Sequence, residues 1–169
     1  MPKKSNTNKY LSIDPSGSGT TGCVFYDEKV YQFFNFTNKN WQEHFNFLSQ
    51  LCQEKKINVL IYENTNFIYG RQFAGSVSLL KLIGGIECLK HVCSTVKQVD
   101  NILVKQVKDF YKKVVQGIFA FPGLERKIGR KGGWFFQGQK INVHELDALL
   151  GLNLYLSPPK EKKAKKITL

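Results

Sequence analysis

The stretch that most constrains the fold of this chain is residues 9–22, where a short apolar segment runs directly into a carboxylate. Residues 10–13 predict a buried strand, Asp14 follows it at once, and the turn that comes next is rich in Pro, Ser and Gly. An ionised carboxylate at the end of a buried strand is costly unless a cation or hydrogen bonds compensate for its desolvation. We therefore interpret Asp14 as a metal ligand to which the rest of the chain brings partners.

The remaining chain alternates strand-like and helix-like segments. Apolar runs and turn residues predict strands at 9–14, 22–27, 29–36, 57–62 and 99–104, and helices at 41–55, 72–93, 105–116 and 142–156. Residues 117–140 are predicted to be a Gly-rich, basic and aromatic connector. Three strands joined by short turns begin the sheet antiparallel, and later crossovers make parallel pairs. This order predicts an α/β protein of the ribonuclease H-like type, a five-stranded mixed sheet flanked by helices.

Charge and domain organisation suggest a polyanionic partner for a single domain. The chain of 169 residues carries 25 Lys and Arg against 13 Asp and Glu, a net charge of +12, and it stays basic when the terminal lysines are set aside. We expect residues 1–8 to be a flexible basic N-terminus, 9–156 to be the folded domain and 157–169 to be a flexible Lys-rich tail.

The four cysteines and the absence of long apolar runs suggest a cytoplasmic protein. No Cys-x-x-Cys or zinc-like His spacing occurs, and Cys23 and Cys52 lie in apolar patterns typical of core residues. The N-terminus has no apolar segment after its lysines, so we expect no signal peptide. We expect no membrane partner, no small-molecule cofactor and a location in the cytoplasm of a bacterial or phage-infected cell.

Three further residues are expected to join Asp14. Glu63 ends the predicted strand 57–62, and His144 and Asp147 lie three apart on the last predicted helix, so both project from one side of it. Ligands in open α/β sheets gather beyond the carboxyl ends of the strands. We therefore expect Asp14, Glu63, His144 and Asp147 to share one site.

A capping-box motif at the start of that helix indicates which of its polar residues are structural and which could be ligands. Asn142 reads as the N-cap and Glu145 as its partner at the third position, so Glu145 is expected to cap the helix rather than bind metal. His144 lies near the helix N-terminus, which favours a neutral imidazole suited to binding metal or orienting water. Clustered carboxylates are tolerated when divalent cations neutralise them, and oxygen ligands favour Mg²⁺ or Mn²⁺. Two such ions would support phosphodiester hydrolysis.

The motifs at 13–22 (IDPSGSGTTG), 61–63 (IYE) and 144–150 (HELDALL) resemble RuvC-type Holliday junction resolvases, in particular their compact phage and small-genome bacterial branch. The resemblance spans nearly the whole chain apart from its ends. It implies a homodimer that resolves four-way DNA junctions by paired nicks with Mg²⁺ or Mn²⁺, in recombination or repair. By position, Asp14, Glu63 and Asp147 match metal-binding acids of the family. His144 stands where relatives carry Asp or His, which leaves open whether it binds metal or orients water.

The same resemblance and the basic residues define an expected DNA surface. The family inserts an aromatic residue into the junction shortly after the second acid, a position that Phe67 or Tyr69 could fill. Other expected DNA-contacting residues are Arg71, Lys105, Lys108, Lys112, Arg126, Arg130 and Lys131. Gly84 and Gly85 in the long predicted helix suggest a close helix–helix contact, and we expect the homodimer to form through this part of the helix.

Other classes remain open from the sequence alone. The same fold could cleave flapped DNA or RNA–DNA hybrids, because the acids would look alike. A branched-DNA-binding protein without catalysis is a further alternative. Residues 13–21 also resemble the phosphate-binding loop of actin-like kinases and chaperone ATPases, but those proteins need a second lobe with a second such loop.

Overall fold

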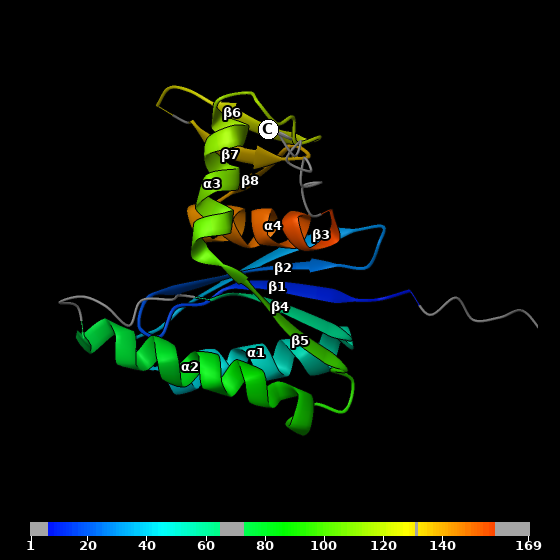
Figure 1. Ribbon diagram of the computed structural model, residues 1–169, viewed down its shortest axis with the longest axis vertical. Helices are drawn as coiled ribbons and strands as arrows, with labels where there is room; N and C mark the ends of the chain where they lie inside the picture. The colour runs from blue at the N-terminus through cyan, green and yellow to red at the C-terminus, as the bar shows by residue number, and fades with distance from the viewer. Residues whose placement is uncertain (1–6, 65–72, 131, 158–169) are drawn as a thin grey trace, which may run out of the picture.

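A mixed sheet of five strands forms the centre of the protein (Figure 1). The computed structural model describes residues 7–64, 73–130 and 132–157, and only the backbone of 73–76. The strands are β1 (Tyr10–Asp14), β2 (Thr20–Tyr26), β3 (Tyr31–Thr37), β4 (Val59–Asn64) and β5 (Gln98–Leu103), in the spatial order β3-β2-β1-β4-β5. The pairs β1–β2 and β2–β3 are antiparallel, whereas β1–β4 and β4–β5 are parallel. The predicted α/β class and five-stranded mixed sheet are confirmed.

Four helices complete the domain: α1 (Trp41–Lys55), α2 (Phe73–Val92), α3 (Val104–Val115) and α4 (Val143–Leu156). Helices α1 and α2 cover one face of the sheet and α4 covers the other, while α3 rises away from the end of β5 (Figure 1). Within the described part of the chain, no helix combines the length and the apolar character needed to cross a membrane.

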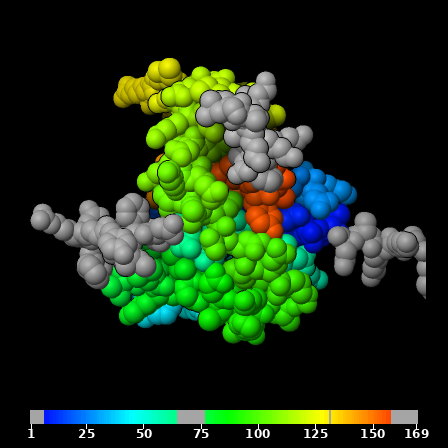
Figure 2. Space-filling view, viewed as in Figure 1, coloured from blue at the N-terminus to red at the C-terminus, as the bar shows by residue number. Residues whose placement is uncertain are grey.

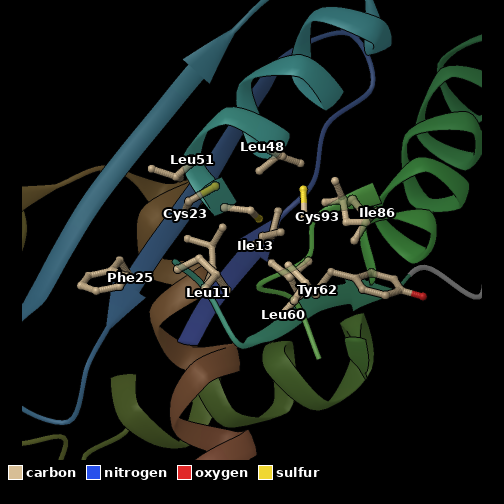
Figure 3. Close-up of a cluster of buried hydrophobic side chains, with 14 of the residues drawn as sticks. Leu11, Ile13, Cys23, Phe25, Leu48, Leu51, Leu60, Tyr62, Ile86 and Cys93 are labelled. Carbon is tan, nitrogen blue, oxygen red and sulfur yellow. The ribbon is translucent and has the colours of Figure 1, made fainter. Parts of the chain in front are cut away.

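Alternation along the strands divides the core into two layers. Leu11 and Ile13 of β1 pack toward α1 and α2 together with Leu60 and Tyr62 of β4 (Figure 3). On the opposite face, Val59 and Ile61 pack toward α4. Because successive side chains of a strand point to opposite faces, the residue parity decides which layer each side chain enters. Cys23 and Cys52 are fully buried, as predicted for small core residues.

The expectation that residues 117–140 form an irregular connector is wrong. They contain most of a second, three-stranded antiparallel sheet made of β6 (Leu124–Lys127), β7 (Gly133–Phe136) and β8 (Gln139–Ile141). Gly138 at φ 82° makes the tight turn between β7 and β8, and Phe136 and Ile141 bury their side chains against the layer that contains Val107. Strands of three or four residues interrupted by Gly and Lys carry too little periodicity to be recognised from the sequence.

The small sheet and α3 stand out from the rest of the protein. Figure 2 shows α3 and the small sheet, in green and yellow, projecting from the body formed by the main sheet and its helices. Tyr111 of α3 packs edge-to-face on Trp134 of β7, with ring centroids 5.9 Å apart. The three-stranded sheet is therefore anchored on α3, the helix that begins beside the carboxyl ends of β4 and β5.

Candidate active site

Asp14 and Glu63 end the two neighbouring parallel strands β1 and β4. Their register pairs Ile13 with Tyr62, so the next residues along the two strands are Asp14 and Glu63. Asp14 lies two residues after Ser12, whose hydroxyl faces Gly151 of α4. Glu63 lies two residues after Ile61, which packs in the layer beneath α4. By strand alternation both carboxylates therefore lie on the α4 face, at the carboxyl edge of the sheet.

Helix α4 approaches this edge closely because β2 contains a glycine there. A Cβ at Gly22 would lie 2.3 Å from the carbonyl carbon and 2.5 Å from the carbonyl oxygen of His144. Gly22 is also the cross-strand partner of Asp14. The close approach places the Nδ1 atom of His144 2.7 Å from the Oδ2 atom of Asp14.

The first turn of α4 is fixed by the predicted capping box. The Asn142 side chain accepts a hydrogen bond from the Glu145 backbone N–H at 2.9 Å, and the Glu145 carboxylate accepts one from the Asn142 backbone N–H at 2.8 Å. The Asn35 side chain of β3 donates a further bond to Glu145 at 3.0 Å. Glu145 is therefore a satisfied structural residue, and the prediction that it caps the helix is confirmed.

Asp147 lies one turn further along α4 and completes a group of acids. Burial raises its pKa to about 6, and the charge of Asp14 adds to the shift, while His144 and Lys108 oppose it. Small residues of α4 face the sheet beside Asp147: Ala148 is buried, and a Cβ at Gly151 would lie 3.4 Å from the Ser12 hydroxyl oxygen.

Glu63 is the residue whose environment most calls for a cation. Burial raises its pKa to about 8, with further contributions from Asp14 and Asp147 and opposing ones from Lys108 and His144. Its Oε2 atom is buried and has no hydrogen-bond partner among the described residues. An oxygen in that state costs free energy that a bound cation would recover.

The donor set fits a hard divalent cation, although not in its present side-chain positions. Three carboxylates and one imidazole supply the oxygen-rich ligands that Mg²⁺ and Mn²⁺ prefer. Among the residues that the structure describes, no three His, Cys, Asp or Glu side chains are grouped tightly enough to enclose an ion. Asp14, Glu63 and Asp147 would therefore have to rotate toward a common centre to bind one.

The expectation that His144 is biased toward its neutral form is wrong in direction. The hydrogen bond to the Asp14 carboxylate raises the pKa of His144, and this effect exceeds the opposing effect of burial. Its position in the first turn of α4, which favours the neutral form, is outweighed by a carboxylate at 2.7 Å.

A buried histidine supports the turn that follows Asp14. The Thr21 hydroxyl accepts a bond from the Ser16 backbone N–H at 3.0 Å and lies 2.8 Å from the Nδ1 atom of His44. The Nε2 atom of His44 lies 3.0 Å from the Asn38 carbonyl oxygen, which can only accept, so Nε2 carries a proton. Thr21 belongs to the motif at 13–22, but no spacing in the sequence identifies His44 as its partner.

The three lysines of α3 that were predicted to contact DNA line a common groove. This groove of about 480 Å³ is bounded by Asn64, Leu103, Val104, Lys105, Lys108, Asp109 and Lys112. Asn64 directly follows Glu63, so the groove begins beside the acids. Lys108, predicted as a DNA contact, also acts on the acids, because its charge lowers the pKa of both Glu63 and Asp147.

The other predicted DNA-contacting residues divide into two groups. Phe67, Tyr69, Arg71 and Lys131 lie outside the described residues. Arg126 and Arg130 are exposed, and Arg126 lies on strand β6, not in a loop as predicted, with its guanidinium 5.8 Å from the centroid of the Trp134 ring.

Comparison with known proteins supports the fold. No protein-family model matches the sequence, and no curated protein matches it. Among solved structures, RuvC of T. thermophilus in complex with a Holliday junction substrate is similar over 85% of this chain and 89% of that chain, with a TM-score of 0.55 and 14% sequence identity. The protein therefore has the ribonuclease H-like fold that its sequence predicts.

Two further structures are more distant. The gp2c part of the large terminase subunit of bacteriophage Sf6, solved with calcium, covers 85% of this chain and 86% of that chain at 13% identity and a TM-score of 0.42. YeaZ from Pseudomonas aeruginosa covers 78% and 62% at 12% identity and a TM-score of 0.41. Neither likeness is close enough to support an argument about this protein.

Proposed function

We propose that the protein is a divalent-metal-dependent DNA endonuclease that resolves four-way junctions. The observation that carries the proposal is the buried, unpartnered Oε2 atom of Glu63, in a site where Asp14 and Asp147 raise the pKa of the same carboxyl. Such an arrangement is unfavourable in a purely structural site and is favourable when a divalent cation binds. The fold and the basic surface support the choice of DNA as substrate.

In this proposal Asp14, Glu63 and Asp147 hold Mg²⁺ or Mn²⁺, which when bound would polarise the scissile phosphate and lower the pKa of the attacking water. His144 is held by Asp14 and lies at the same edge of the sheet. If a cation bound there, Asp14 would be one of the ligands, and His144 would either be a further ligand or be the group that accepts a proton from the attacking water. Lys108 lines the groove and its charge acts on Glu63 and Asp147, so its ammonium group could hold the phosphate beside the acids.

The groove along α3 supports a nucleic-acid strand running away from the acids. Lys105, Lys108 and Lys112 present three ammonium groups, with Asp109 pairing to Lys112 at 3.8 Å. Lysine contacts to phosphates give affinity without sequence readout, which suits an enzyme that selects DNA by its shape.

Paired nicking of a junction requires two active sites, and one face of α2 suggests how two copies would associate. Val77, Leu80, Gly84, Cys88 and Val92 form an exposed stripe at helical spacing. A Cβ at Gly84 would meet no atom within 4 Å, whereas one at Gly85 would lie 2.9 Å from the Phe45 ring of α1. Gly85 therefore serves packing within the chain, and Gly84 is the glycine available to a second copy.

The test is incubation of the protein with four-way junction, flap, duplex and RNA–DNA hybrid substrates in Mg²⁺, Mn²⁺ or chelator. We expect metal-dependent, symmetrically paired nicks in the four-way junction and much slower cleavage of duplex. Preferred cleavage of flaps or hybrids would replace the resolvase with another nuclease of this fold. Binding without cleavage in either metal would leave a branched-DNA-binding protein.

A further inference from the structure

The hairpin formed by β6 and β7 extends past β8, the third strand of the small sheet, by one residue pair. Strand β6 is an edge strand, since the order is β6-β7-β8. The pairing of Trp134 with Ile141 is the last contact between β7 and β8 toward the tip, whereas β6 and β7 continue to the pair Lys127–Gly133. Only this last pair and the turn beyond it therefore have no third strand beside them, while Arg126 and Trp134 still lie where β8 pairs with β7.

Aromatic rings of β7 hold one cation of β6 on each face of the hairpin. The Arg126 guanidinium lies 5.8 Å from the Trp134 ring centroid, and the Lys127 ammonium lies 4.4 Å from the Phe135 ring centroid. Neighbouring residues of a strand point to opposite faces. Cation–π contacts restrain long side chains before they bind, so less conformational entropy is lost when a phosphate is contacted. Glu125 lies 3.9 Å from Lys127 and offsets part of its charge.

The tip carries an apolar side chain that no part of the described chain covers. Ile128 is 97% exposed, the highest value among the exposed large hydrophobic residues, and basic Lys127 and Arg130 stand on either side of it. Gly129, at φ 115°, makes the turn just after it. Single exposed apolar residues are ordinary on a protein surface. An isoleucine between cations at the end of the hairpin suits a partner surface that has charged groups on both sides of a less polar groove.

We propose that the β6–β7 hairpin is a second DNA contact, which enters a groove of a duplex arm. Arg126 and Lys127 would contact the phosphates on the two sides of the groove, and Ile128 would lie against the sugars and base edges. The DNA major groove admits a two-stranded β-ribbon, and its walls are two phosphate backbones. Lys127 covers the ring of Phe135, which argues against that ring stacking on an unpaired base. The inference rests on the proposed DNA substrate but not on the proposed chemistry.

Binding without catalysis separates this inference from the nuclease proposal. The full chain carrying Glu63→Gln is titrated with four-way junction in chelator at several salt concentrations. Adding Arg126→Gln with Lys127→Gln should lower affinity at least about tenfold and reduce the slope of log K against log salt by about 1.8. Ile128→Ala should lower affinity and leave the slope unchanged. The matched control is Lys29→Gln with Lys97→Gln. Both lysines are exposed, and both lie in loops at the end of the main sheet opposite to Asp14 and Glu63.

Each outcome of the titration decides the inference. Unchanged DNA affinity and salt slope in the variant with Arg126→Gln and Lys127→Gln would overturn the hairpin contact. Metal-dependent cleavage by the chain without any substitution would still support the nuclease. Absence of DNA binding by the parent would overturn both. The same chains are also tested for binding to phosphatidylserine vesicles. If Arg126→Gln with Lys127→Gln abolishes vesicle binding and leaves DNA affinity intact, the hairpin binds a membrane surface and the DNA contact is overturned.

A tethered chelate locates the hairpin on the DNA. Ile128→Cys is made in a Cys88→Ser background, since Cys88 is the exposed cysteine and Cys23, Cys52 and Cys93 are buried. An iron chelate attached to it should cut nucleotides within a duplex arm. The same chelate on Val30→Cys, an exposed site in the β2–β3 turn, should not. Cuts confined to unpaired nucleotides at the branch point would contradict placement in a duplex groove.

Discussion

Gly22 of β2 lies directly against the backbone carbonyl of His144 in the first turn of α4, so close that a Cβ at Gly22 would lie 2.3 Å from the His144 carbonyl carbon. Because Gly22 is also the β-sheet partner of Asp14, the same contact brings the His144 imidazole within 2.7 Å of the Asp14 carboxylate. A residue without any chemistry of its own thereby positions the site.

We expect Gly22→Ala to destabilise the protein by about 1–3 kcal/mol, because the added methyl group meets backbone atoms that cannot rotate away. The free energy of unfolding in urea measures this change. Gly19→Ala is the matched control, since its Cβ would lie 2.8 Å from the movable Ser16 hydroxyl oxygen. Equal stability of the two variants would contradict the close packing of α4 on β2.

Stability of the metal-free protein should fall as pH rises. Glu63 has a pKa raised to about 8 from 4.5, and Asp147 has one raised to about 6 from 3.8. A raised pKa means that the folded protein binds protons more tightly than the unfolded chain, so the stabilisation is complete below the unfolded value and is lost as pH rises through the folded value. The hydrogen bond to Asp14 also raises the pKa of His144, which acts in the same direction.

Thermal unfolding in chelator between pH 4 and 9 measures this dependence. We expect the midpoint to decline with rising pH, most clearly between about pH 4.5 and 8, and Glu63→Gln to flatten the decline. Saturating Mn²⁺ should raise the midpoint most at the alkaline end, where the carboxylates are ionised. A midpoint that rises with pH in chelator would contradict the raised pKa values.

Lys108→Gln should slow cleavage by about 10- to 100-fold, the effect expected for losing one charged hydrogen bond to the phosphate. It should also reduce the salt slope of DNA binding by about one. Lys113→Gln on the same helix is the control, because Lys113 is exposed but does not line the groove. Equal cleavage rates for the two variants would remove Lys108 from the proposed phosphate contact.

Leu80→Glu should convert a homodimer into a monomer. Leu80 lies on the exposed stripe of α2 and is 50% exposed, and a two-fold contact there would bury two like charges close together. Light scattering after size exclusion at micromolar concentration measures the mass. Val30→Glu, at 49% exposure in the β2–β3 turn, should leave the mass unchanged. A monomeric mass for the parent protein would contradict a dimer formed through this stripe of α2 and, with it, paired incision.

The main sheet could be predicted from the sequence because its central strands β1, β2 and β4 are buried and the strand order follows from turn lengths and crossovers. The apolar run before Glu63 marked a central strand, and Asn142 with Glu145 marked the start of α4. The small sheet could not be predicted, since its strands are short and one-sided. The upward shift of the His144 pKa was also beyond prediction, because it depends on a contact with Asp14 across 130 residues of sequence. The close contact at Gly22 could have been predicted, because a glycine inside a strand often marks a close backbone approach.

The most direct test of the central claim is the binding of Mn²⁺ to the metal-free protein, followed by electron paramagnetic resonance of the free ion. The account predicts that the parent binds Mn²⁺, that Asp14→Asn, Glu63→Gln and Asp147→Asn each weaken this binding strongly, and that Glu125→Gln in the small sheet binds like the parent. Glu63→Gln binding Mn²⁺ as tightly as the parent would contradict the assignment of the acids as a metal site.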